Sequence, residues 1–104
     1  MGLGDEAERL AHQVGDSRIV VMGNHGVMAV AGNIALAFDE LYYFERACRN
    51  YIGALQTGKA LKVVSDAVAE KTRDQWRSMD QALANAHLRE IREILDREEP
   101  DYAQ

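Results

Sequence analysis

Residues 18–58 read RIVVMGNHGVMAVAGNIALAFDELYYFERACRNYIGALQTG, and the spacing of apolar side chains changes once along this stretch. Residues 19–22 form a continuous branched and apolar run, typical of a strand that is buried on both faces. A second apolar run over residues 27–31 predicts another strand. The tetrapeptide GNHG at residues 23–26 lies between them, and its residue types build tight turns. The sequence therefore predicts two short strands joined by a turn that contains His25.

The rest of the chain has helical spacing. The pattern predicts a short helix over residues 5–14 and a long helix over residues 34–57, which ends at Gly58. The long helix has one apolar stripe, which we expect to face a core. The stripe consists of Ala37, Leu41, Phe44, Cys48, Tyr51, Ile52 and Leu55.

A last helix is predicted over residues 67–97, with Ser65 and Asp66 as candidate N-caps. Its length would be about 45 Å, wider than a domain of this size. It therefore either breaks near residues 78–86 or protrudes toward another chain. Its apolar positions do not stay on one stripe of the helix, which favours a bend. Residues 98–104 are expected to form a flexible tail.

Two short strands form a sheet that is marginal in water. The strand at residues 19–22 reads as a central strand, yet no further strong strand follows. We therefore expect residues 1–104 to be a single incomplete domain, with the missing strands in an absent segment or in another chain. The alternative is a small, mostly helical domain that covers a two-stranded sheet and acts by self-association. An open strand edge also predicts that the chain associates.

Composition excludes several classes of function. The chain has 104 residues and a net charge of −5 with mixed signs, which argues against a nucleic-acid partner. No apolar stretch is long enough to cross a bilayer, so no membrane partner is expected, and the N-terminus does not resemble a signal peptide. Cys48 is the only cysteine, so no internal disulfide forms, and a reducing cytoplasm is the expected location.

Three histidines, His12, His25 and His87, share no metal-ligand spacing, and the sequence contains neither a His-x-His pair nor an HExxH motif. We interpret His12 and His87 as structural or solvated side chains. His25 differs because Asn24 and Gly26 both tolerate a positive φ, so the turn could present its imidazole. On residue types alone, His25 is either an ordinary turn residue or a metal ligand.

Other candidate side chains also have structural interpretations. Glu45 could act as an acid or base if it were buried, but a pair with Arg49 or with Arg46 explains it as well. Cys48 lies on the apolar stripe and is interpreted as a core residue rather than a nucleophile. Residues 42–44 are three consecutive aromatics, so at least one of them should face another layer or subunit.

Three motifs occur in order and at close spacing: NHG at residues 24–26, ALAF at residues 35–38 and LYYFERAC at residues 41–48. Together they resemble the class II aldolase/adducin family, and the likeness covers about residues 16–60. The resemblance implies an α/β fold, a three-layer αβα sandwich of which this chain is a helix-rich part with two short strands. It also implies a homo-oligomer, often a tetramer.

The resemblance implies a function as well. Family enzymes bind a divalent metal, usually zinc, through a His-x-His pair and a later histidine in the turn, which His25 matches. The metal polarises a substrate carbonyl and stabilises an enediolate. A glutamate in the first half of the family domain transfers the proton. The family includes sugar-phosphate aldolases, an epimerase and the non-catalytic adducins.

This chain lacks the His-x-His pair and the acidic residue, so it resembles the C-terminal half of the family domain. We expect the complete domain to cleave or rearrange a sugar phosphate or a similar small hydroxy-carbonyl molecule, as a lyase or epimerase. The chain alone is expected to be inactive, with no assigned catalytic residue and an incomplete metal site. The alternative is an adducin-like, non-catalytic oligomerisation module. No motif here anchors a match for Tyr102 to the C-terminal tyrosine of some family members.

Overall fold

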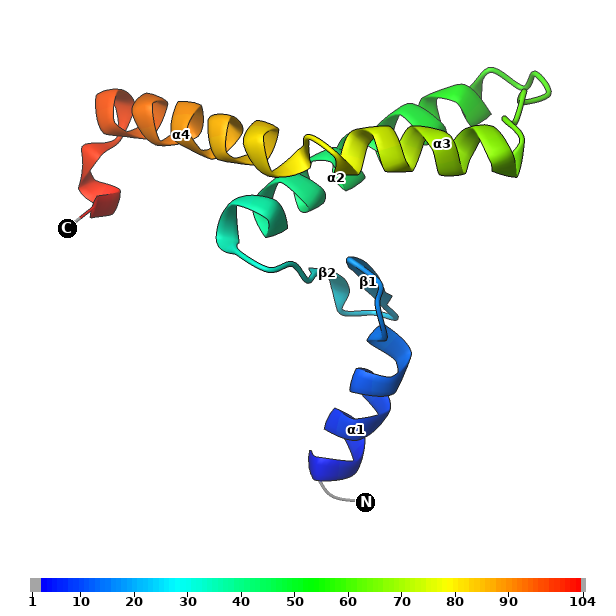
Figure 1. The fold of residues 1–104 in the computed structure, drawn as a ribbon, viewed down its shortest axis with the longest axis horizontal. Helices are drawn as coiled ribbons and strands as arrows, with labels where there is room; N and C mark the ends of the chain where they lie inside the picture. The colour runs from blue at the N-terminus through cyan, green and yellow to red at the C-terminus, as the bar shows by residue number, and fades with distance from the viewer. Residues whose placement is uncertain (1–2, 104) are drawn as a thin grey trace.

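The structure is a computed structural model that describes residues 3–103. Five helical segments and one β-hairpin follow each other along the chain (Figure 1). In order they are α1 (Leu3–Val14), β1 (Ile19–Met22), β2 (Gly26–Ala29), α2 (Ile34–Gln56), α3 (Asp66–Arg77), α4 (Asp80–Glu98) and the 3₁₀ helix η1 (Pro100–Ala103).

Strands β1 and β2 form an antiparallel hairpin whose register pairs Ile19 with Ala29 and Met22 with Gly26. The loop between them therefore has three residues. Its sharp reversal needs left-handed backbone at two positions, and these are Asn24, with φ of 65°, and Gly26, with φ of 108°. The predicted strand–turn–strand unit is confirmed, although the second strand ends at Ala29 rather than at residue 31.

The helix boundaries follow local signals. Asn33 caps α2, because its side-chain oxygen accepts a hydrogen bond from the backbone N–H of Leu36 at 3.0 Å. Ser65 caps α3 in the same way, as predicted. The long last helix does break within the expected window: α3 ends at Arg77 and α4 begins at Asp80, with Ser78 and Met79 between them.

Helices α2 and α4 make the main tertiary contact of the chain. The hairpin contacts α2, while α1 projects from the far side of the hairpin, away from the three long helices (Figure 1). The radius of gyration is 17.4 Å, whereas a compact chain of this length has about 13 Å. The molecule is therefore open in shape.

The described residues enclose very little core. Ala84 is the one hydrophobic residue among them that is fully buried, and the two other buried residues are Asp39 and Asp80. The accessible surface is 8794 Å², while a compact monomer of this mass exposes about 5,800 Å². The excess of about 3,000 Å² is of the size that stable protein interfaces cover.

Two apolar surfaces that the sequence predicts are therefore open within the described residues. Val21 is 68% exposed, so β1 is not covered on both faces, because within residues 3–103 no second layer lies over the hairpin. The apolar stripe of α2 is also largely open to solvent, and its exposed members are Leu41, Tyr51, Ile52 and Leu55. Within the described residues α2 contacts the hairpin without closing a core over it, which does not support the alternative of a small helical domain that covers its own sheet.

The C-terminal residues differ from the expected tail in their local structure. Glu98 still belongs to α4, and Pro100–Ala103 form η1. The Tyr102 hydroxyl donates a hydrogen bond of 2.5 Å to the Asp96 carboxylate, which ties η1 back to α4. The mobility of this tail stays a prediction. None of the helices within residues 3–103 is both long and apolar enough to cross a membrane.

Candidate functional site

His25 lies at the tip of the hairpin and is exposed. Its backbone N–H donates a hydrogen bond of 3.1 Å to the carbonyl of Met22, which closes the turn. The left-handed backbone at Asn24 and Gly26 on either side is the conformation that their residue types predict. The turn thus leaves the imidazole open to contact from outside the chain.

The described residues do not bring a second metal ligand to His25. His12 is exposed on α1, and His87 on α4 is hydrogen-bonded to Asp39. Among residues 3–103 there is no group of three His, Cys, Asp or Glu side chains that could hold a metal ion. The donor set of the described residues therefore does not fit a complete metal centre.

His87 and Asp39 form a pair between α4 and α2, in which Asp39 is buried and His87 is half-buried. The Nδ1 atom of His87 lies 2.8 Å from Oδ1 of Asp39, and the Asp39 side chain is only 6% exposed. The imidazole also packs edge-on against the ring of Tyr42, with centroids 4.5 Å apart, and close to Phe38 and Tyr43. The structural interpretation of His87 is therefore confirmed, and its partner is a carboxylate 48 residues away.

Arg18 connects three elements. It precedes β1 and donates to Glu40 of α2 at 2.7 Å and to Asp80 at the start of α4 at 2.9 Å. The hydrogen bonds to Asp80 and Glu40 raise the pKa of Arg18 above its usual value, so the guanidinium stays charged at any physiological pH. This side chain fixes the hairpin against α2 and α4.

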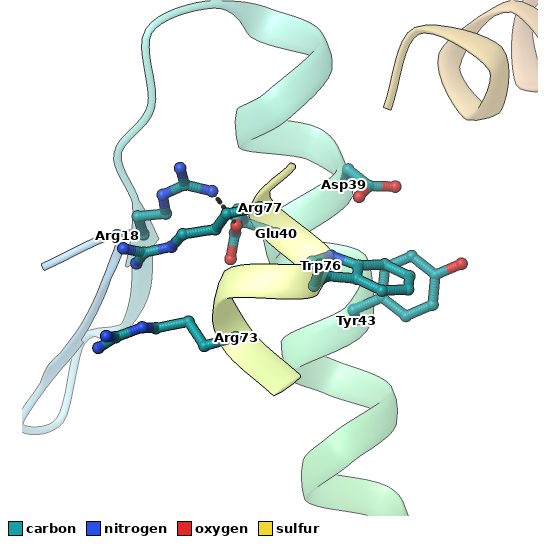
Figure 2. A pocket seen from close by; sticks show the side chains of 7 residues that line it. All are labelled: Arg18, Asp39, Glu40, Tyr43, Arg73, Trp76 and Arg77. Atoms are coloured by element: carbon teal, nitrogen blue, oxygen red, sulfur yellow. Dashed lines mark hydrogen bonds and ion pairs between the residues drawn. The ribbon is translucent and has the colours of Figure 1, made fainter. Parts of the chain in front are cut away.

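A pocket of about 200 Å³ lies beside this ion-pair cluster, between α2, α3 and the start of the hairpin. Figure 2 shows its lining side chains: Arg18, Asp39, Glu40, Tyr43, Arg73, Trp76 and Arg77. The rings of Tyr43 and Trp76 meet edge to face, with centroids 5.7 Å apart. Tyr43 thus contacts α3 and Tyr42 contacts α4, so at least one aromatic of the run on α2 faces another helix, as expected.

The remaining sequence candidates have structural roles. Glu45 pairs with Arg49 at 2.9 Å, and both side chains are mostly exposed, so Glu45 is not a buried acid or base. Cys48 is a free, half-buried cysteine. Arg46 donates to the Tyr42 hydroxyl at 2.7 Å rather than to Glu45.

Sequence reasoning missed the pocket. Its residues come from three segments that are far apart in the chain, and only Tyr43 lies in one of the motifs. The one local signal is Arg18, a charged residue directly before an apolar strand, since such a residue near a sheet end requires a partner.

The sequence profile of the class II aldolase and adducin N-terminal domain matches residues 1–52. The chain belongs to the class II aldolase and adducin family. The match includes α1, which the three motifs alone had not covered, and it ends within α2.

One relative of the same family gives a longer alignment. It is a "Putative aldolase class 2 protein" of Caulobacter vibrioides, 26% identical over 100 residues, an alignment that covers 95% of this chain and 39% of the relative. The chain thus spans about two fifths of the length of the curated relative that it matches. No solved structure matches the chain significantly.

Proposed function

We propose that this chain is the C-terminal part of a class II aldolase-like domain, with a three-layer αβα sandwich completed by residues outside it. The complete domain would be a lyase or epimerase that cleaves or rearranges a sugar phosphate or a similar hydroxy-carbonyl substrate, in the cytoplasm. Family membership is the observation that carries this proposal. The large exposed apolar surface and the open hairpin support the completion by further residues.

Within this function His25 would be one ligand of a divalent metal ion, and an imidazole-rich donor set favours zinc. Its exposure at the tip of the hairpin supports that role, because further ligands can reach the imidazole from outside this chain. When bound, the metal would supply Lewis-acid polarisation of a carbonyl oxygen. What this chain supplies is the position of one imidazole, fixed by the hairpin register and the backbone hydrogen bond to Met22.

The experiment assays the complete protein that contains this chain for aldehyde release from a panel of ketose phosphates and for epimerisation of pentulose phosphates. We expect turnover that a chelator abolishes and added Zn²⁺ restores. His25→Ala should lower kcat/KM at least about tenfold, while His12→Ala, an exposed histidine on α1, should not change it. Turnover that is equal in the two variants would rule out the role of His25.

The second candidate is an adducin-like, non-catalytic module that assembles copies of this chain. The exposed stripe of α2 favours it, because four large apolar side chains there lack cover within the described residues. Sedimentation of the complete protein separates the two candidates in combination with its metal content. A homo-oligomer without bound metal and without turnover supports the module, whereas a metal-containing oligomer with turnover supports the enzyme.

A further inference from the structure

Two of the three arginines at the pocket beside Arg18 are not held by a carboxylate from another part of the described residues. Three guanidinium groups line it, from Arg18, Arg73 and Arg77. Arg18 is engaged by Glu40 and Asp80. Arg77, in contrast, has no ion-pair partner anywhere in residues 3–103, and Arg73 has only a 3.5 Å contact with its neighbour in sequence. Two guanidiniums at this pocket therefore keep free hydrogen-bond donors.

The charged and the aromatic side chains of the pocket lie on different sides of it. Figure 2 shows the three arginine side chains extending toward one side of the pocket, and Tyr43 and Trp76 on the other. The Asp39 carboxylate points away from the arginines and is bound to His87, so it does not compete for them. Trp76 is 42% exposed, which leaves part of the indole face open.

Helix electrostatics account for part of this cluster only. Arg77 lies in the last turn of α3, where a cation complements the helix dipole. That explanation does not cover Arg73, one turn earlier, or Arg18 from a different segment. It also does not explain the large aromatic side chains left exposed at the same place.

We propose that this pocket binds a small organic oxyanion, a phosphate or carboxylate carried on a compact planar body. Arg77 and Arg73 hold the oxyanion, because a planar guanidinium matches the oxygens of phosphate and carboxylate with paired donors. Trp76 contacts the planar body. Arg18 is held by Glu40 and Asp80 and so takes no direct part in binding the oxyanion. The volume of about 200 Å³ suits a ligand of this size. The proposal requires neither a metal nor His25.

Trp76 provides the readout, because it is the only tryptophan in the chain. The protein is titrated with phenyl phosphate, benzoate and inorganic phosphate while tryptophan fluorescence is followed. We expect a saturable change with phenyl phosphate, with benzoate or with both, and at least fivefold weaker binding of inorganic phosphate. A response to phenyl phosphate alone assigns phosphate, and a response to benzoate alone assigns carboxylate. The absence of a saturable change with both aromatic probes would overturn the proposal.

Three variants locate the binding. Arg77→Ala should weaken binding at least tenfold, because it removes charged hydrogen bonds, and Arg77→Lys should keep part of the affinity. The matched control is Arg89→Ala, an exposed arginine on α4 outside the pocket, which should bind normally. Equal affinity in wild type and Arg77→Ala, or an equal loss in Arg89→Ala, would contradict the site. His25→Ala should also bind normally, so this result is independent of the proposed metal function.

Discussion

Asp39 shows what single residues contribute to this fold. It is 4% exposed overall, and a carboxylate that is buried to this degree needs a hydrogen-bond donor. His87 supplies that donor from α4, across the main helix–helix contact of the chain. The sequence could not reveal this pair, because the two residues lie 48 positions apart and neither lies in a motif. The position of His25, by contrast, follows from the residue types on either side of it.

Removing the donor should therefore destabilise the protein. We predict that His87→Leu lowers the free energy of unfolding by about 2 kcal/mol, since Asp39 is left buried without a partner. His87→Asn should recover much of this loss, because its side-chain amide can place an N–H close to the position of Nδ1. Urea unfolding measures both variants. A leucine variant as stable as wild type would show that the pair contributes nothing.

At the scale of elements, the helix and strand boundaries were largely predictable, because they depend on neighbouring residues. Ser65 caps α3, Gly58 has a positive φ of 72° just after α2, and the hairpin turn lies where its residue types place it. The break after Arg77 was expected only as a range, since no glycine or proline marks it. The ion pairs of Arg18 were not predictable, because Glu40 and Asp80 lie 22 and 62 positions away from it in the sequence.

Asn33 allows a test at this scale, because its side chain has two separable roles. Its oxygen caps α2, and its Nδ2 donates a hydrogen bond of 2.8 Å to Gln81 of α4. We predict that Asn33→Ala costs about 1 kcal/mol of stability through loss of the cap. Asn33→Asp keeps the acceptor and removes the donor, so it should cost clearly less. Thermal unfolding of both variants distinguishes the roles, and equal losses would mean that the cap is not the main contribution.

At the scale of the whole molecule, the main feature is the large exposed surface. Two short strands without further strands to pair with predicted an incomplete domain. The structure exposes about 3,000 Å² more surface than a compact monomer of this mass. The apolar stripe of α2 was identified as a pattern, and it is largely exposed within the described residues. Periodicity shows that a face is apolar, and it does not show which part of a protein covers that face.

The proposed role of this open molecule is to supply one ligand, His25, to a metal site that other residues complete. The most direct measurement is the divalent metal content of the purified complete protein, compared among wild type, His25→Ala and His12→Ala. We predict that wild type and His12→Ala bind metal equally and that His25→Ala binds it at least about tenfold more weakly. Full metal content in His25→Ala would contradict the assignment of His25 as a ligand.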